Sequence, residues 1–284
     1  RIKASLVLYT YENQWDPNSK DIILKGESQN YVITAGINEI IINMKTDYVK
    51  LYVTKNDSIQ DKIDWIAQNG NSTQKYKIIL SEYGDDPFNE LIEFKSSLNN
   101  RAKSITFTSD NPEKVAFKTS GSTYSFPCQI LVSTYTKIIF ENIQMKPDCN
   151  FAIIQSGSDS NVTIGQGTKL VDNKSHDNAI SVAGGRVIME GDATISGFKS
   201  AGSVYITHGG FIMQGKSRIY DCESDSDGGA IYLANINNTF TLREKATIEN
   251  CKAATDGGAI YHKGSTVTIE SGSIINCEAG RRGG

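Results

Sequence analysis

Hydrophobic and polar residues alternate in short runs through the second half of the chain. Thr266–Glu270 reads Thr-Val-Thr-Ile-Glu, and Phe240–Leu242 reads Phe-Thr-Leu. This two-residue period is typical of strands that bury one face. No helical spacing of apolar residues is sustained over ten residues in this half. The pattern therefore predicts many short β-strands separated by tight turns.

The same half of the chain repeats itself. Three copies align: Ile219 to Tyr232, Ile248 to Tyr261, and Ile274 to the end. In each copy a cysteine is followed six residues later by Gly-Gly, and in the first two Gly-Gly leads into Ala-Ile-Tyr. The residues expected to define the repeat are Cys222, Gly228, Gly229, Cys251, Gly257, Gly258 and Cys277.

Weaker copies extend the repeat upstream. They form a column of Asn173, Phe198, Cys222, Cys251 and Cys277, with spacings of 25, 24, 29 and 26 residues. A propeller blade needs about 40 residues, and a helical repeat would need two amphipathic helices. The expected fold class is therefore all-β, a right-handed parallel β-helix with one coil per repeat. Each coil should carry three strands and three turns, with Gly-Gly allowing the turn into the next strand.

The first half predicts the opening of the same solenoid. Ser58 is a suitable N-cap with Asp61 at the third helical position, and a helix from there should end at Asn69–Gly70. Its apolar face, Ile59, Ile63 and Ile66, would plug the open end of the core. Strands are then expected at Lys77–Leu80, Leu91–Phe94, Ser104–Phe107, Lys114–Phe117, Gln129–Val132 and Lys137–Phe140.

Two domains follow from this reading. Residues 58–284 form the β-helix, which stops within a repeat. Residues 1–57 are a β-rich segment, either a small separate domain or the end of a preceding one. Both ends of the chain enter or leave β-type sequence directly, so we expect a segment of a longer protein.

Gly228–Tyr232 and Gly257–Tyr261 both read Gly-Gly-Ala-Ile-Tyr, which resembles the repeats of polymorphic outer-membrane-protein (Pmp) adhesins over about residues 150–284. Where that family has Phe-X-X-Asn, this chain has Ile219–Cys222 and its equivalents. Ser58–Phe117 more loosely resembles the entry of pectin-lyase-like β-helices. The resemblance implies an extracellular or cell-surface adhesin that binds a glycan or protein on another cell. It also implies a parent protein anchored in a membrane outside this chain.

Tyr205, Tyr232 and Tyr261 occupy equivalent positions in the repeat. If Ile231 and Ile260 face the core, these tyrosines face outward, because alternate strand residues point to opposite sides. An exposed tyrosine column, with His262 and Lys263 close in sequence, is the candidate ligand-binding surface. The alternative is that the column only stacks between strands and stabilises the sheet.

The composition of the chain limits the classes of binding partner that can be expected. The formal net charge of -3 and pI of about 5.7 argue against nucleic acid or an anionic membrane as the main partner. We expect a glycan, a protein, or further chains of a surface assembly instead. Asn-X-Ser/Thr sequons lean toward a secreted protein; they begin at Asn56, Asn71, Asn161, Asn173 and Asn237.

No constellation predicts catalysis, a cofactor or a metal. Asp85–Asp86 and the acidic run Glu223, Asp225 and Asp227 fall in turns and read as solvated, although the second could hold Ca²⁺ weakly. The histidines, at positions 176, 208 and 262, lack ligand spacing. We therefore expect no enzyme. A structural spacer and a polysaccharide lyase or hydrolase remain the alternatives to the adhesin.

The cysteines and threonines give two further expectations. Cys222, Cys251 and Cys277 should stack as free, buried thiols, because a parallel ladder does not readily give disulfide geometry. Cys128 and Cys149, 21 residues apart, are the better disulfide candidates. Thr163, Thr194 and Thr268 alternate with charged residues and do not form Thr-X-Thr arrays throughout, as an ice-binding face would require.

Overall fold

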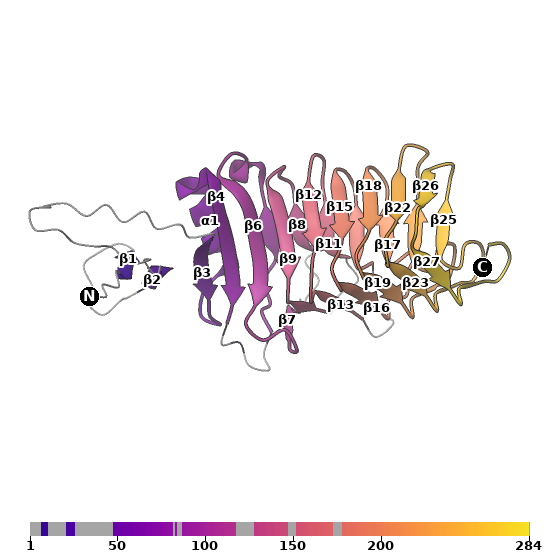
Figure 1. The fold of residues 1–284 in the computed structure, drawn as a ribbon, viewed down its shortest axis with the longest axis horizontal. Helices are drawn as coiled ribbons and strands as arrows, with labels where there is room; N and C mark the ends of the chain where they lie inside the picture. The colour runs from indigo at the N-terminus through magenta and orange to yellow at the C-terminus, as the bar shows by residue number, and fades with distance from the viewer. Residues whose placement is uncertain are drawn as a thin grey trace, which may run out of the picture.

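Parallel β-sheets form the walls of a solenoid (Figure 1). The structure, a computed structural model, describes residues 48–81, 83, 87–117, 128–146, 152–172 and 178–283, and the backbone of two strands before them. Those two, β1 (Val7–Thr10) and β2 (Asp21–Lys25), pair antiparallel with each other. The expected fold class, an all-β parallel β-helix, is confirmed.

Within the described residues, one sheet of the solenoid has nine strands. They are β3 (Val49–Val53), β4 (Asn71–Leu80), β6 (Ala102–Ser109), β9 (Lys137–Glu141), β12 (Asn161–Ile164), β15 (Arg186–Met189), β18 (Gly210–Met213), β22 (Thr239–Leu242) and β26 (Thr266–Ile269). We call this the nine-stranded sheet. It faces the viewer in Figure 1.

The other two long sheets have seven described strands each. The β5–β25 sheet contains β5 (Ile92–Phe94), β8 (Cys128–Val132), β11 (Ala152–Ser156), β14 (Ile180–Val182), β17 (Val204–Ile206), β21 (Ile231–Leu233) and β25 (Ile260–His262). The β7–β27 sheet contains β7 (Val115–Phe117), β10 (Gln144–Met145), β13 (Lys169–Val171), β16 (Thr194–Ser196), β19 (Arg218–Tyr220), β23 (Thr247–Glu249) and β27 (Ser273–Ile275).

A short fourth sheet lies in the turns between coils. It is formed by β20 (Glu223–Ser224), β24 (Lys252–Ala253) and β28 (Glu278–Ala279). Each coil of the second half thus passes through the β5–β25 sheet, the nine-stranded sheet and the β7–β27 sheet in turn. The three strands per repeat expected from the sequence are present, and the short sheet is an addition to them.

Helix α1 (Ile59–Asn69) closes the N-terminal end as predicted. The Ser58 side chain accepts a hydrogen bond from the Asp61 amide, and the apolar face of Ile59, Ile63 and Ile66 is buried. Strand β3, which precedes the helix, nevertheless pairs in parallel with β4. The nine-stranded sheet therefore includes residues before the expected boundary at 58.

Side chains distant in sequence hold helix α1 against the N-terminal end of the solenoid. The Glu90 carboxylate accepts hydrogen bonds from the Ser58 hydroxyl at 2.7 Å and the Ile59 amide at 2.9 Å, so its negative charge lies at the helix N-terminus. The Gln60 side chain bonds both the amide and the carbonyl of Glu93, in the terminal strand β5. Together with the 3-10 turn η1 (Ser96–Leu98), these contacts cover a strand edge that would otherwise be open.

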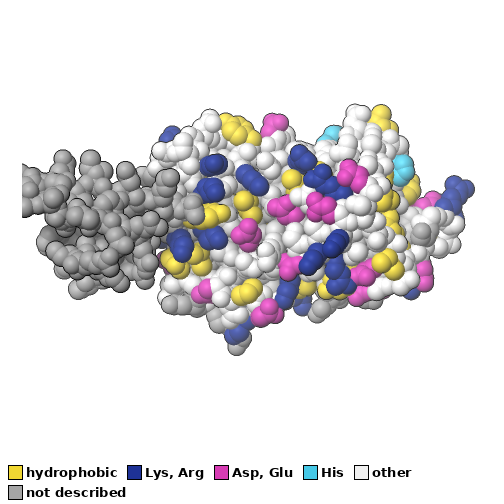
Figure 2. Space-filling view, viewed as in Figure 1, with side chains coloured by type: hydrophobic (Ala, Val, Ile, Leu, Met, Phe, Trp, Pro, Cys, Tyr) yellow, Lys and Arg dark blue, Asp and Glu magenta, His cyan; other side chains and the backbone are white. Residues whose placement is uncertain are grey.

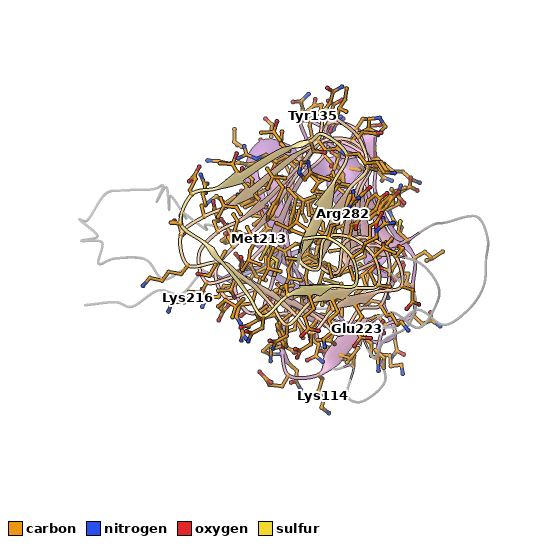
Figure 3. The ribbon with its side chains drawn as sticks, turned by 90° about the vertical axis from the view of Figure 1, so that its right-hand side faces the viewer. Lys114, Tyr135, Met213, Lys216, Glu223 and Arg282 are labelled. Carbon is orange, nitrogen blue, oxygen red and sulfur yellow. The ribbon has the colours of Figure 1, made fainter. Side chains whose placement is uncertain are left out.

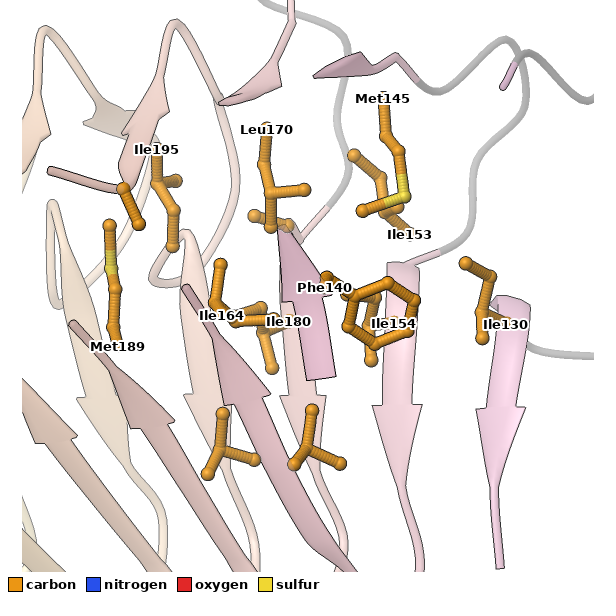
Figure 4. Close-up of a cluster of buried hydrophobic side chains, with 14 of the residues drawn as sticks. Ile130, Phe140, Met145, Ile153, Ile154, Ile164, Leu170, Ile180, Met189 and Ile195 are labelled. Carbon is orange, nitrogen blue, oxygen red and sulfur yellow. The ribbon is translucent and has the colours of Figure 1, made fainter. Parts of the chain in front are cut away.

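Columns of apolar side chains fill the interior. Figure 4 shows Ile130, Ile154 and Ile180 from one wall meeting Phe140, Ile164 and Met189 from the second and Met145, Leu170 and Ile195 from the third. Each of these side chains is fully buried. In Figure 3, which looks along the long axis of the solenoid, Met213 lies inside while Lys114 and Lys216 project at the periphery.

The two positions of the Gly-Gly pair require glycine for two different physical reasons. Gly228 and Gly257 adopt positive φ angles of 72° and 69°, which L side chains rarely adopt. Gly229 and Gly258 do not. Instead the next coil lies so close that a Cβ on Gly229 would be 2.1 Å from the carbonyl oxygen of Gly258. The first glycine is required by conformation and the second by coil stacking.

Replacing Gly229 by alanine should lower the free energy of unfolding by about 2–4 kcal/mol, because two coil backbones would have to separate. Gly264→Ala is the control. Gly264 also has a positive φ of 81°, but its Cβ would meet only the Ile236 side chain at 3.3 Å. That variant should lose about 1 kcal/mol, from backbone strain alone. Urea unfolding followed by circular dichroism measures both, and equal losses would contradict the stacking explanation.

Candidate functional site

Tyr205, Tyr232 and Tyr261 form one ladder on the outer side of the β5–β25 sheet. They are in register on β17, β21 and β25, next to the inward-facing Ile231 and Ile260. Ring centroids are 5.1 Å apart for Tyr205–Tyr232, with planes 19° apart, and 5.0 Å for Tyr232–Tyr261, with planes 31° apart. All three side chains are partly exposed. The structure therefore brings together the three predicted residues.

Stacking decides which part of each ring a ligand can reach. Because the rings are nearly parallel, the faces of Tyr232 are covered by its neighbours. The ring edges and phenolic hydroxyls are left to face outward. Tyr205 is in register with Ser181 on its other side, so its second face has no aromatic neighbour. The ladder thus offers a row of hydroxyls, and among the described residues the outer ring faces of Tyr205 and Tyr261 have no aromatic neighbour.

Lys263 extends this surface and His262 does not. The Lys263 ammonium lies 5.5 Å from the Tyr232 ring centroid. A hydrogen bond with Tyr232 is the main cause that raises the pKa of Lys263, so the group stays charged. His262 is in register with Leu233, a fully buried core residue, and so belongs to the inward-facing column. Its closeness to the tyrosines in sequence does not place it on their face.

The remaining positions of Gly-Gly-Ala-Ile-Tyr are explained by packing. Ala230 is fully buried and Ala259 nearly so, at the corner where a coil turns into the β5–β25 sheet. Ile231 is fully buried in the core. Of the five motif residues, only the tyrosine presents a functional group outward. A ligand contact by this motif therefore has to use the tyrosine.

The cysteine column lies inside the solenoid. Phe198, Cys222 and Cys251 are fully buried and Cys277 is partly exposed, and all three cysteines are free. Each thiol donates to a carbonyl two residues earlier, at 3.3–3.4 Å. The preceding residue, Asp221, Asn250 or Asn276, adopts a positive φ, which Asp and Asn tolerate better than most residues. The expectation of free, buried thiols is confirmed for Cys222 and Cys251, whereas Cys277, in the last coil, is free but partly exposed.

The acidic turn weighed as a Ca²⁺ site makes contacts between coils instead. Asp227 Oδ1 accepts hydrogen bonds from the Thr255 hydroxyl and from the Asp256 amide of the next coil. Asp225 pairs with Lys199 at 3.1 Å. Asp256 in turn pairs with Arg281, which holds the pKa of the Asp256 carboxyl below its usual range. These carboxylates connect successive turns.

Other candidates are dispersed or lie outside the described residues. No group of three or more His, Cys, Asp or Glu side chains could hold a metal ion in the described part of the chain. Thr163 and Thr268 belong to the nine-stranded sheet, whereas Thr194 belongs to the β7–β27 sheet. Cys128 is a free, buried thiol. The residues outside the described ranges are Asp85, Asp86, Cys149, Asn173 and His176.

Sequence reasoning missed a group of lysines on the nine-stranded sheet. Lys75 and Lys77 alternate with the buried Tyr76 and Ile78, so both point outward from β4. The alternation was a visible signal. Their neighbours Lys50 and Lys137 come from strands distant in sequence, and only the register shows that they share this face.

No protein-family model, curated protein or solved structure matches this chain. Within the described residues, no helix has the length and apolar character needed to cross a membrane.

Iodoacetamide at mildly alkaline pH should modify Cys277 well before Cys128 or Cys251. Cys277 is partly exposed, and its interaction with the neighbouring Cys251 thiol lowers its pKa to about 7. Burial raises the pKa of Cys128 to about 12, so that thiol stays protonated. Contact with Cys222 and Cys277, together with burial, also raises the pKa of Cys251.

Peptide mass spectrometry after timed labelling measures this order, and the urea-unfolded chain, in which all thiols should react, is the control. Early labelling of Cys128 in the native chain would contradict its burial.

The raised pKa of Cys128 also has a consequence for stability. Between 9.0 and about 12 the unfolded chain loses the Cys128 proton while the folded chain keeps it. The free energy of unfolding should therefore fall as pH rises through this range, and less so in Cys128→Ala.

Proposed function

We propose that this chain is a β-helical binding module of a cell-surface or extracellular, Pmp-like adhesin, and that it contacts a glycan or protein on another cell. The tyrosine ladder of Tyr205, Tyr232 and Tyr261 carries this proposal. It is a row of aromatic hydroxyls repeated at 5.0–5.1 Å on the outside of a regular wall. The resemblance of the Gly-Gly-Ala-Ile-Tyr repeats to adhesin repeats supports it.

The ladder has the properties of a recognition surface. Tyrosine combines a large apolar ring with a hydroxyl that both donates and accepts, which suits contacts with sugars and with proteins. Stacking already restricts the side-chain torsions, so binding would lose little further side-chain entropy. Lys263 adds a cation beside the hydroxyls. A partner that is polar and carries some negative charge fits this combination.

A structural spacer is the second candidate, and a specific observation favours it. Turn carboxylates such as Asp225, Asp227 and Asp256 are used in contacts between coils. The stacked tyrosines can likewise stabilise adjacent strands without any ligand. The two functions differ in what the hydroxyls do, because a spacer needs the rings but not the hydroxyl groups.

The labelled chain should bind saturably to members of a combined glycan array and cell panel. The triple variant Tyr205→Phe, Tyr232→Phe and Tyr261→Phe keeps the stacked rings and removes only the outward hydroxyls. We expect it to fold with an unchanged melting temperature and to bind at least about tenfold more weakly, as expected when several hydrogen bonds are lost.

The matched control is Tyr52→Phe, which removes the hydroxyl of a 52% exposed tyrosine on another sheet. It should bind as the wild-type chain does. Full binding by the triple variant would exclude the hydroxyl ladder as the contact. No binding of the wild-type chain to any glycan or cell would favour the spacer, and co-purification of further chains would support that reading.

A further inference from the structure

A group of lysines occupies the outer side of the nine-stranded sheet near its N-terminal end. It consists of Lys50 on β3, Lys75 and Lys77 on β4, and Lys137 on β9; we call it the lysine lattice. Figure 2 shows Lys and Arg side chains gathered over this part of the face, with few acidic side chains between them. The chain as a whole has a formal net charge of -3, so this is a local reversal of sign.

Strand register places the four lysines side by side. Lys50 lies directly opposite Lys77, and Lys75 and Lys137 both lie opposite Ser104 from its two sides. Neighbouring strands are about 4.8 Å apart, so the backbones carrying Lys75 and Lys137 are about 9.6 Å apart. Like charges at such positions repel each other and destabilise a sheet. Nearby negative charge would therefore stabilise this surface.

The described part of the chain supplies little counter-charge. Lys77 approaches Glu141 at 4.0 Å, and no other ion pair within the described residues involves the lattice. Lys75 and Lys77 instead share the ring of Tyr48, with ammonium-to-centroid distances of 5.4 Å and 4.9 Å. An aromatic face attracts the cations but does not neutralise them. The ammonium groups remain available to an external anion.

A row of hydroxyl side chains runs along β6, between the strands that carry the lysines. Ser104, Thr106 and Thr108 lie on the same side of β6 and are almost completely buried by the longer side chains around them. The Thr106 hydroxyl is fully buried and has no hydrogen-bond partner. Lys77 on β4 and Glu141 on β9 reach toward each other across β6, next to this hydroxyl. An anion that draws Lys77 away from Glu141 would give Thr106 an acceptor for its proton.

We propose that the lysine lattice binds an acidic polysaccharide, whose carboxylate or sulfate groups pair with Lys75, Lys77 and Lys137 and accept a hydrogen bond from Thr106. The lattice lies on a different sheet from the tyrosine ladder, so the two binding surfaces are independent. Carboxylates and sulfates share the required chemistry, namely negative charge with several acceptor oxygens.

A thin, hydroxylated polyanion fits this surface better than a membrane or an acidic protein. The lattice is narrow, and the net negative charge of the chain disfavours a broad anionic surface such as a bilayer. Once Lys77 is drawn away, the unpaired hydroxyl of Thr106 can donate to a partner that carries acceptor oxygens of its own.

Binding of the full chain should be measured by biolayer interferometry on immobilised heparin, alginate and dextran, which are sulfated, carboxylated and neutral. Two further probes, polyglutamate and vesicles containing phosphatidylserine, represent an acidic polypeptide and an anionic membrane. We expect saturable binding to heparin, alginate or both, no binding to dextran, and a decrease as salt is raised. The ratio of heparin to alginate affinity separates sulfate from carboxylate as the group recognised.

The double variant Lys75→Gln/Lys137→Gln should weaken that binding by about fivefold to thirtyfold, the range expected for losing two exposed charge pairs. Lys216→Gln/Lys245→Gln removes the same charge from exposed positions in the turns after β18 and β22, and should leave binding unchanged. Thr106→Val should weaken binding by about threefold to tenfold without lowering the melting temperature, because it removes an unpaired hydroxyl.

Equal losses in the two double variants would overturn the lysine lattice as the site, because only the total charge would matter. Tighter binding to polyglutamate or to the vesicles than to either acidic polysaccharide would overturn the class of ligand. The Tyr205/Tyr232/Tyr261→Phe chain should keep its affinity for the acidic polysaccharide. Failure of the tyrosine ladder as a contact would therefore leave this result intact.

Discussion

The stacking of one coil on the next is the interaction on which the rest of this structure depends. Parallel strand pairing sets the distance between coils at about 4.8 Å, and each side chain then lies against its equivalent in the next coil. Phe211 and Phe240 therefore stack in the core at 5.9 Å, and Tyr205 and Tyr232 stack outside at 5.1 Å. The same closeness leaves no space for a Cβ at Gly229.

Coil stacking also determines what the polar residues of the turns do. A carboxylate in one turn lies next to backbone amides and cations of the next turn, and it bonds to them. Asp227 contacts Thr255 and Asp256, and Asp256 pairs with Arg281. Residues that resemble a metal or catalytic cluster in the sequence are thereby used to join coils. The groups left for a partner are those that face outward from the sheets.

The two proposed surfaces depend on coil stacking in opposite ways. In the tyrosine ladder, stacking is favourable in itself, since each ring packs on the next, and binding would use only the outward hydroxyls. In the lysine lattice, stacking places like charges beside one another and leaves the Thr106 hydroxyl without a partner. That arrangement lowers stability, and a bound polyanion would relieve it.

Local sequence patterns were sufficient for the coil architecture. Alternation over a few residues located strands such as Lys137–Phe140, observed as β9 (Lys137–Glu141), and the cap and apolar spacing located α1 from Ser58. The two copies of Gly-Gly-Ala-Ile-Tyr, with a weaker copy upstream at Tyr205, placed the three tyrosines in one outward column. These features depend on residues a few positions apart, or on repeated copies of one unit, and the sequence displays both directly.

Only the tertiary structure decided which distant residues become neighbours. Glu90 caps a helix that begins 31 residues earlier, and β3 joins a sheet across α1. Lys50, Lys75 and Lys137 share a face although they belong to three different coils. Register between coils creates these contacts, and register follows from the summed packing of the core and the lengths of the turns. No short stretch of the sequence contains that information.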